Sequence, residues 1–136
     1  MLSSSPVRAW PPDEIAQSML DQGMAMRRSY DFLGALNVLN RLVEYCPEYA
    51  EGYNQRAFVN FLRQDFPPAL GDLDRAIELS PNHIAALSGR ALTLMGLGRN
   101  EEAREALKQA LELNPWLSER SLLAPGGPLE PEGQDL

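Results

Sequence analysis

The chain has 136 residues, of which 44% are hydrophobic and 23% are charged, and its formal net charge is −7 at pH 7. This length and apolar content suit one compact domain with a continuous core. A surface that is negative on average repels a phosphate backbone, so nucleic-acid binding is not expected. The single cysteine excludes an internal disulfide, and no apolar run is long enough to span a membrane.

The N-terminal segment, residues 1–12, contains three prolines and is predicted to be extended. Trp10 is expected to pack on the first helical hairpin, because an exposed indole leaves a large apolar surface in water. The segment lacks the basic and apolar regions of a signal peptide, so we expect a cytoplasmic protein, or a periplasmic one if a signal peptide has been removed. The first helix is predicted to begin near Asp13, whose carboxylate suits the positive end of a helix dipole.

A period of 34 residues organises most of the chain. Pro47, Pro81 and Pro115 follow this period. The same spacing relates four series of small residues and leucines: Ala35, Ala69 and Ala103; Leu39, Leu73 and Leu107; Gly23, Ala57 and Ala91; and Leu42, Ala76 and Ala110. Coincidence does not produce so many series in one register, so the sequence predicts three repeats, at residues 16–49, 50–83 and 84–117.

Each repeat is predicted to form two helices joined by a turn, because its apolar residues recur at helical spacing. Small residues are expected where the two helices meet, with leucines between neighbouring hairpins. In the third repeat, Gly98 is expected to end the first helix in the left-handed conformation and Asn100 to cap the second. Asp65 is the expected N-cap in the second repeat. The turn of the first repeat, residues 29–31, has no glycine and is the least well defined.

The last part of the chain is predicted to close the array. Residues 116–123 can form about two helical turns that cap the third hairpin. Trp116, Leu122 and Leu123 are expected to face that hairpin, while Glu119 and Arg120 form a polar outer face.

A tail rich in proline, glycine and acidic residues follows at residues 124–136. Such a segment is either disordered or laid along a surface. If the tail lies in a groove of the array, Leu129 and Leu136 are the expected anchors, and the tail would then compete with partners.

These residues resemble the tetratricopeptide repeat (TPR) family, whose pattern W-x2-L-G-x2-Y…A-x3-F…P is matched at the small residue, the alanine, the apolar residue four positions later and the proline. The departures are Gln22, Arg56 and Arg90 at the usual leucine, Met26, Asn60 and Leu94 at the usual tyrosine, and Tyr53 at the usual tryptophan. The resemblance covers residues 16–117. It implies an all-α fold, a right-handed α-solenoid of three helix-turn-helix hairpins with a C-terminal capping helix, in a TPR domain at residues 13–123.

The resemblance also implies that the first helices of successive repeats line a concave groove, which receives a peptide or a segment of another protein. The groove-facing positions would be Gln17, Leu20, Met24, Arg27, Arg28, Glu51, Asn54, Phe58, Phe61, Leu62, Ala85, Ser88, Leu92 and Met95. None of them is lysine, so the family's clamp for a C-terminal carboxylate is not expected, although Arg27 or Arg28 with Asn54 would suit an acidic group.

The remaining groove positions form an apolar strip, consisting of Met24, Phe58, Phe61, Leu92 and Met95. Either the chain's own ends cover this strip, or it receives an extended or helical segment of a partner. The predicted peptide-binding set is therefore Met24, Arg27, Arg28, Asn54, Phe58, Phe61, Leu92 and Met95.

The sequence offers little catalytic chemistry. His83 is the only histidine and is expected to have a structural or solvent-facing role. No spacing of metal ligands is present, and Cys46 has no obvious base beside it, so neither a metal site, a cofactor nor an enzyme is expected.

The pattern therefore favours a protein–protein interaction module that serves as a scaffold or adaptor, because TPR arrays are specific for a fold and not for one function. Two alternatives stay open at this point. One is a small chaperone-like adaptor that shields an apolar client segment. The other is a subunit that associates with further copies of itself.

Overall fold

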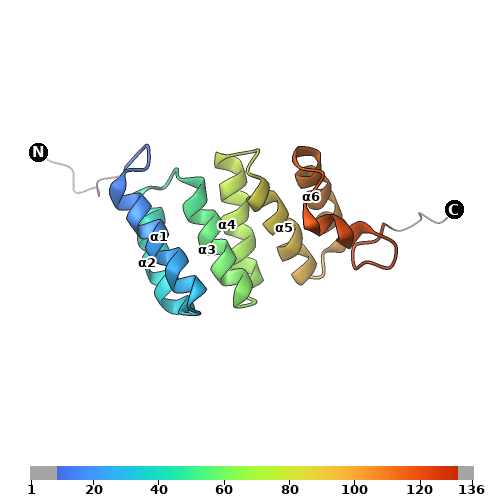
Figure 1. The fold of residues 1–136 in the computed structure, drawn as a ribbon, viewed down its shortest axis with the longest axis horizontal. Helices are drawn as coiled ribbons and strands as arrows, with labels where there is room; N and C mark the ends of the chain where they lie inside the picture. Colours follow the sequence, from blue (N-terminus) through green and yellow to red (C-terminus); the bar gives the residue numbers. More distant parts are fainter. Residues whose placement is uncertain (1–8, 132–136) are drawn as a thin grey trace, which may run out of the picture.

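The computed structural model describes residues 9–131, which form an all-α stack of three helical hairpins (Figure 1). The remaining residues, including Leu136 and most of the segment predicted to be extended, lie outside the described part. The helices are α1 (Glu14–Arg28), α2 (Phe32–Tyr45), α3 (Ala50–Leu62), α4 (Phe66–Leu79), α5 (Ile84–Gly96) and α6 (Asn100–Leu113), followed by the 3₁₀ helix η1 (Ser118–Leu123). None of these helices is both long enough and apolar enough to cross a membrane.

The hairpins lie side by side in a row, and each contacts the next, as expected for a solenoid (Figure 1). Within each hairpin the helices approach closely because the facing residues are small. Gly23 leaves no room for a side chain, since a Cβ there would lie 2.8 Å from Leu39 Cγ. Ala57 packs in one buried cluster with Ala69, and Ala91 does the same with Ala103. Small residues therefore lie where the two helices meet, as predicted, but Gly23 contacts Leu39 of its own hairpin, a leucine that was expected to lie between hairpins.

The three turns inside the hairpins share one geometry at the 34-residue period. Tyr30, Gln64 and Gly98 all adopt the left-handed conformation, with φ values of 65°, 61° and 77°. Each is followed by a residue whose N–H bonds to a carbonyl five positions earlier, as from Asp65 to Asn60 at 2.8 Å. This is the Schellman motif. The first turn, which has no glycine, follows the same rule as the third.

The N-terminal caps correct two expectations. Asp13 caps α1 as expected, accepting from the Ala16 N–H at 2.9 Å. Asp65 precedes α4 but makes no side-chain cap bond, because Pro67 and Pro68 stand where the donating N–H groups would be. Asn100 is the first residue of α6 and not its cap, because the 34-residue register places Arg99 at the cap position.

Two arginines at the usual leucine position form polar links on the helices. Arg56 of α3 donates from Nε and Nη2 to both oxygens of Asp72 on α4, at 2.8 and 2.7 Å. Its third nitrogen, Nη1, donates to Asn40 of the preceding hairpin at 3.1 Å. One repeat later, Arg90 donates to Asp74 at 2.7 Å. These departures from the family pattern therefore replace apolar contact with ion pairs within and between hairpins.

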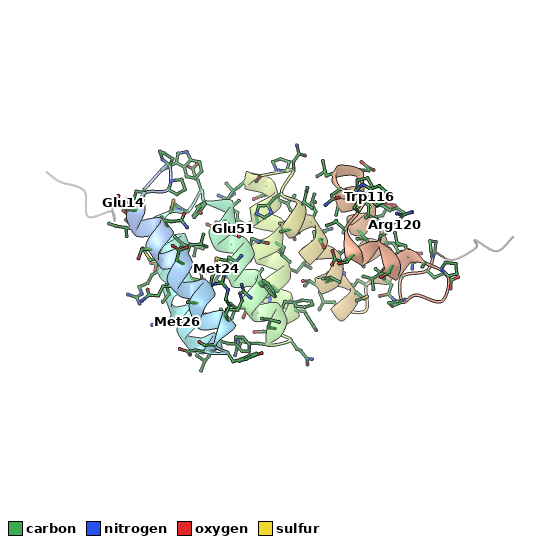
Figure 2. The ribbon with its side chains drawn as sticks, viewed as in Figure 1. Glu14, Met24, Met26, Glu51, Trp116 and Arg120 are labelled. Atoms are coloured by element: carbon green, nitrogen blue, oxygen red, sulfur yellow. The ribbon has the colours of Figure 1, made fainter. Side chains whose placement is uncertain are left out.

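The C-terminal end of the stack is closed by leucines. Leu122, Leu123 and the fully buried Leu129 pack against the core of the third hairpin, and the Leu129 N–H bonds to the Leu122 carbonyl at 2.9 Å. The predicted cap is thus present, in 3₁₀ form. Trp116, however, is 82% exposed, because these leucines occupy the surface it was expected to cover (Figure 2).

The expectation for Trp10 was also wrong, since its side chain is 57% exposed. Its neighbour Ala9 makes the contacts with the first hairpin instead. The Ala9 N–H donates to the Tyr45 carbonyl at 2.8 Å, and its carbonyl accepts from the Cys46 thiol at 3.0 Å. Backbone pairing at Ala9 therefore fixes this segment and leaves the indole outside.

The shared turn geometry predicts opposite effects of one exchange at two equivalent positions. Gln64→Gly is expected to raise the free energy of unfolding by about 1 kcal/mol, because glycine adopts a positive φ without strain. Gly98→Gln is expected to lower it by about the same amount through backbone strain alone, because a Cβ at this position would meet no other part of the chain within 4 Å. Urea unfolding followed by circular dichroism measures both. Equal signs for the two variants would contradict the shared geometry.

The two arginine links predict unequal losses from the same substitution. Arg56→Leu is expected to lower the free energy of unfolding by about 2 to 3 kcal/mol, because it leaves the buried Asp72 carboxylate unpaired. Arg90→Leu is the matched control and should cost less than about 1 kcal/mol, since Asp74 is 53% exposed. Adding Asp72→Leu to Arg56→Leu should restore most of the loss in urea unfolding. If the double variant is no more stable than Arg56→Leu, the ion pair is not the contribution of Arg56 to stability.

Candidate functional site

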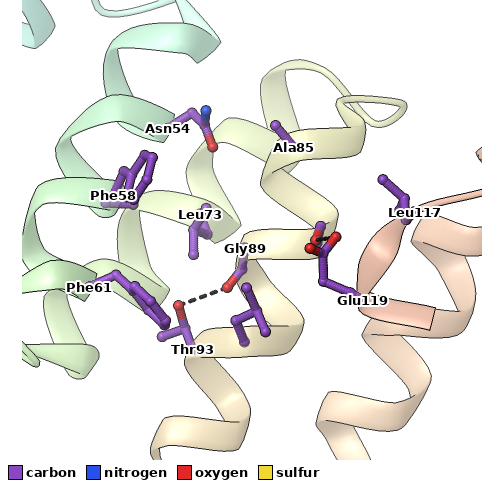
Figure 3. Close-up of a pocket in the computed structure, with 12 residues that line it drawn as sticks. Asn54, Phe58, Phe61, Leu73, Ala85, Gly89, Thr93, Leu117 and Glu119 are labelled. Carbon is purple, nitrogen blue, oxygen red and sulfur yellow. Dashed lines mark hydrogen bonds between the residues drawn. The ribbon is translucent and has the colours of Figure 1, made fainter. Parts of the chain in front are cut away.

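A groove of about 340 Å³ lies between α3 and α5 and ends against the first residues of the C-terminal cap (Figure 3). Its lining residues come from four elements and the loop before η1: Asn54, Ala57, Phe58, Phe61, Leu73, Ala85, Ser88, Gly89, Leu92, Thr93, Leu117 and Glu119. Most of these side chains are apolar. The groove is therefore suited to apolar side chains of a ligand, with a few polar groups at its edges.

The hollow results from a difference in side-chain size between the two helices. On α3, Phe58 and Phe61 provide large rings, and Phe58 is 41% exposed. On α5, the facing positions include Ala85 and Gly89, which leave space. The Thr93 hydroxyl donates to the Gly89 carbonyl at 2.8 Å, so its polar group is already satisfied within α5 (Figure 3).

Glu119 is the charged residue of the groove lining, which corrects the expectation that it lies on the outer face of the cap. One of its oxygens accepts from Ser88 Oγ of α5 at 3.0 Å, and the other accepts from Ser118 Oγ at 2.9 Å. The reason is the 3₁₀ geometry of η1, in which residues three apart share one side. Leu122 packs on the third hairpin, so Glu119 also faces inward. Arg120 is exposed, as expected.

Arg27 of α1 lies at the other side of Phe58. Its guanidinium carbon is 4.4 Å from the centroid of the Phe58 ring, which is a cation–π contact. Burial, with repulsion from Arg28, lowers the pKa of Arg27 below its ordinary value. Its buried Nε has no hydrogen-bond partner in the described part of the chain.

The structure brings half of the predicted peptide-binding set together in this groove, namely Asn54, Phe58, Phe61 and Leu92. The others lie outside its lining. Met24 packs with the core of the first hairpin (Figure 2). Met95 packs with the core of the third, and Arg28 is exposed on α1. Met95 follows Leu92 by three residues and so lies near the groove side of α5, but its side chain packs with the core of the third hairpin instead. As a binding site, the set stays a prediction.

Several lining residues were not predicted. Gly89 and Thr93 follow Ala85 at steps of four, so helical spacing could have indicated them. Leu117 and Glu119 belong to the cap and not to a repeat, and no repeat register applies to them. Their position depends on how the chain turns after Pro115, which the sequence pattern does not specify.

Comparison with known proteins agrees with this architecture. The sequence model of the tetratricopeptide repeat matches residues 84–115. Tetratricopeptide repeat protein 36 of Xenopus tropicalis is 33% identical over 114 residues, covering 79% of this chain and 55% of the relative. Its homolog in Nematostella vectensis is 45% identical over 65 residues, covering 48% of this chain and 36% of the relative. The chain thus spans about half the length of these curated relatives, or less.

Solved structures show the same fold. The first TPR domain of Spaghetti (RPAP3), bound to the HSP90 peptide SRMEEVD, has a TM-score of 0.78 and 22% sequence identity, covering 83% of this chain and 90% of that one. The chain belongs to the tetratricopeptide repeat family. The groove of this TPR protein contains no lysine, since the one lysine of the sequence, Lys108, lies exposed on α6.

His83 has a structural position in the TPR stack. Its Nδ1 accepts from the Ala86 N–H at 3.1 Å and so caps α5, while Nε2 pairs with Glu51 Oε1 of α3 at 2.7 Å. The hydrogen bond to Glu51 raises the pKa of His83. Cys46 is fully buried, and burial raises the pKa of its thiol. No cluster of three or more potential metal ligands occurs within residues 9–131.

The buried position of Leu129 predicts a stability effect separate from the groove. Leu129→Ala is expected to lower the free energy of unfolding by about 3 kcal/mol, because it leaves a cavity against the third hairpin. Urea unfolding measures the loss. Leu113→Ala, at a leucine that is 42% exposed on α6, is the control and should cost clearly less. Equal losses would mean that Leu129 does not close the TPR stack.

Proposed function

We propose that this TPR protein is a non-catalytic interaction module that binds a segment of another protein in the groove between α3 and α5. The observation behind the proposal is an exposed aromatic ring beside an apolar hollow. Phe58, which lines the groove, is 41% exposed, and Leu62 one turn later on α3 is exposed to the same extent. Exposed apolar surface beside a hollow is typical of a site that a ligand covers.

The size of the groove limits what it holds. Pockets that enclose a whole small ligand have volumes of about 300–1,000 Å³. At about 340 Å³, this groove lies at the low end of that range, and it also has room for one or two anchor side chains of a longer segment. The backbone of the segment then runs across α3 and α5. Such a partner is an extended or helical peptide with aromatic or aliphatic anchors.

The Spaghetti domain suggests a more specific alternative, a chaperone-binding adaptor. That domain is bound to an HSP90 peptide, SRMEEVD, that contains three acidic residues. Here the groove contains Glu119 and no lysine, so carboxylates of an acidic peptide that lie at the end next to η1 would be close to another carboxylate. Charge at that end therefore disfavours the acidic part of such a peptide.

Three further forms of the proposal differ in what the module does with its partner. A scaffold would form a stable ternary complex with two partners, whereas a chaperone-like adaptor would suppress aggregation of one client at a stoichiometric ratio. A self-associating subunit would show a mass that rises with concentration in size-exclusion chromatography with light scattering.

The groove predicts which substitutions abolish peptide binding. Phage-displayed random peptides of 12 residues are selected on the purified protein, and the consensus peptide is titrated by calorimetry. Leu92→Glu is expected to weaken binding at least about tenfold, because it places a charge in the apolar hollow. Phe58→Ala should have a similar effect. Leu92 and Phe58 are better positions to substitute than Phe61, because the Phe61 ring supports the fold. It packs edge-on against the Phe66 ring, with 5.6 Å between the ring centroids.

Leu33→Glu is the matched control, since Leu33 is 71% exposed on α2 and does not line the groove. It should bind as the wild type does. Circular dichroism and thermal unfolding must show that all three variants are folded. Unchanged binding by folded Leu92→Glu would reject the groove as the site.

A further inference from the structure

We infer that the segment bound by this groove carries a lysine or arginine at its end nearest the C-terminal cap, where it pairs with Glu119, while an apolar residue fills the hollow beside Phe58 and Leu92. The inference rests on the proposed function and adds the chemistry and direction of the partner. It depends on the charge of one wall of the groove.

The Glu119 carboxylate is fixed in place before a ligand arrives. Ser88, only 8% exposed, donates to one oxygen, and Ser118 donates to the other. A carboxylate accepts about four hydrogen bonds, so each oxygen can still accept another donor. A held carboxylate loses little conformational entropy on binding, and lysine or arginine supplies the donors that it lacks.

No cation in residues 9–131 forms an ion pair with Glu119. The arginines of the second and third hairpins all pair with other carboxylates, as Arg56 does with Asp72 and Arg90 with Asp74. The neighbouring Arg120 is exposed and does not line the groove. The wall next to η1 therefore stays acidic, at the edge of a largely apolar hollow where water screens charge less than in bulk.

The opposite end of the site has the opposite charge. Along the stack the order is α1, α3, α5 and η1, so Arg27 on α1 and Glu119 on η1 lie on either side of the apolar lining (Figure 1). Arg27 contacts the Phe58 ring and retains a buried Nε without a partner among the described residues. A segment whose basic end points toward η1 matches this arrangement, and the reverse direction opposes it.

The test uses the same peptide selection on three forms of the protein: wild type, Glu119→Lys and Glu112→Lys. Glu112 is exposed on α6 and outside the groove, so its substitution makes the same charge change away from the proposed binding site. Wild type and Glu112→Lys are expected to enrich lysine or arginine at a fixed distance from an apolar anchor. Glu119→Lys is expected to enrich aspartate or glutamate at that position.

A thermodynamic cycle then tests the pair directly. The wild-type consensus peptide and its basic-residue-to-glutamine version are titrated against wild type and Glu119→Gln, which keeps the shape of the side chain. Each single change should weaken binding about tenfold, and the second change should add little.

The possible failures are distinct. Enriched peptides without a basic preference, an unchanged preference in Glu119→Lys, or additive losses in the cycle would each overturn the inference and leave groove binding standing. If folded wild-type protein enriches no peptide, the proposed function itself is rejected.

Discussion

Close contact between the two helices of each hairpin is the constraint on which the rest of the structure depends. Gly23 has no space for a side chain against Leu39, and Ala57 and Ala91 occupy the same position in the following repeats. Larger side chains pack around these small residues both within a hairpin, as Leu39 does, and between hairpins, as Leu73 does beside Gly89. The groove follows from this arrangement, since the first helices of the second and third hairpins stand side by side with their concave sides only partly filled.

The periodic part of the sequence predicted the fold well. Proline, alanine and leucine series at 34 residues defined the hairpins, and the structure has all six helices in that register. The period was even a better guide to the turns than residue type. Tyr30 and Gln64 adopt the left-handed conformation that glycine adopts in the third repeat, because the Schellman hydrogen bonds impose it. Local preference alone had left the first turn poorly defined.

The aperiodic parts were predicted less well, for reasons of packing. Both tryptophans are exposed, because Ala9 at one end and a group of leucines at the other already fill the surfaces beside the outer hairpins. Half of the expected binding set lines the groove, and Glu119 was assigned to the wrong side. Its orientation depends on the 3₁₀ turn after the last repeat, which helical periodicity does not describe. Residue chemistry was available from the sequence, but the direction of the side chain was not.

The place of Glu119 has a consequence for how recognition and folding are related in this molecule. The carboxylate belongs to η1, whereas the residues that hold the hairpins together belong to the repeats. A change at this one position alters the charge of the groove without touching the small residues that the stack requires. Under the proposed function, one charge that selects a partner therefore lies in the cap, whereas the small residues that set the packing within hairpins lie in the repeats. A scaffold with this division can acquire new partners by exchanging a few residues at its edge while its repeats stay constant.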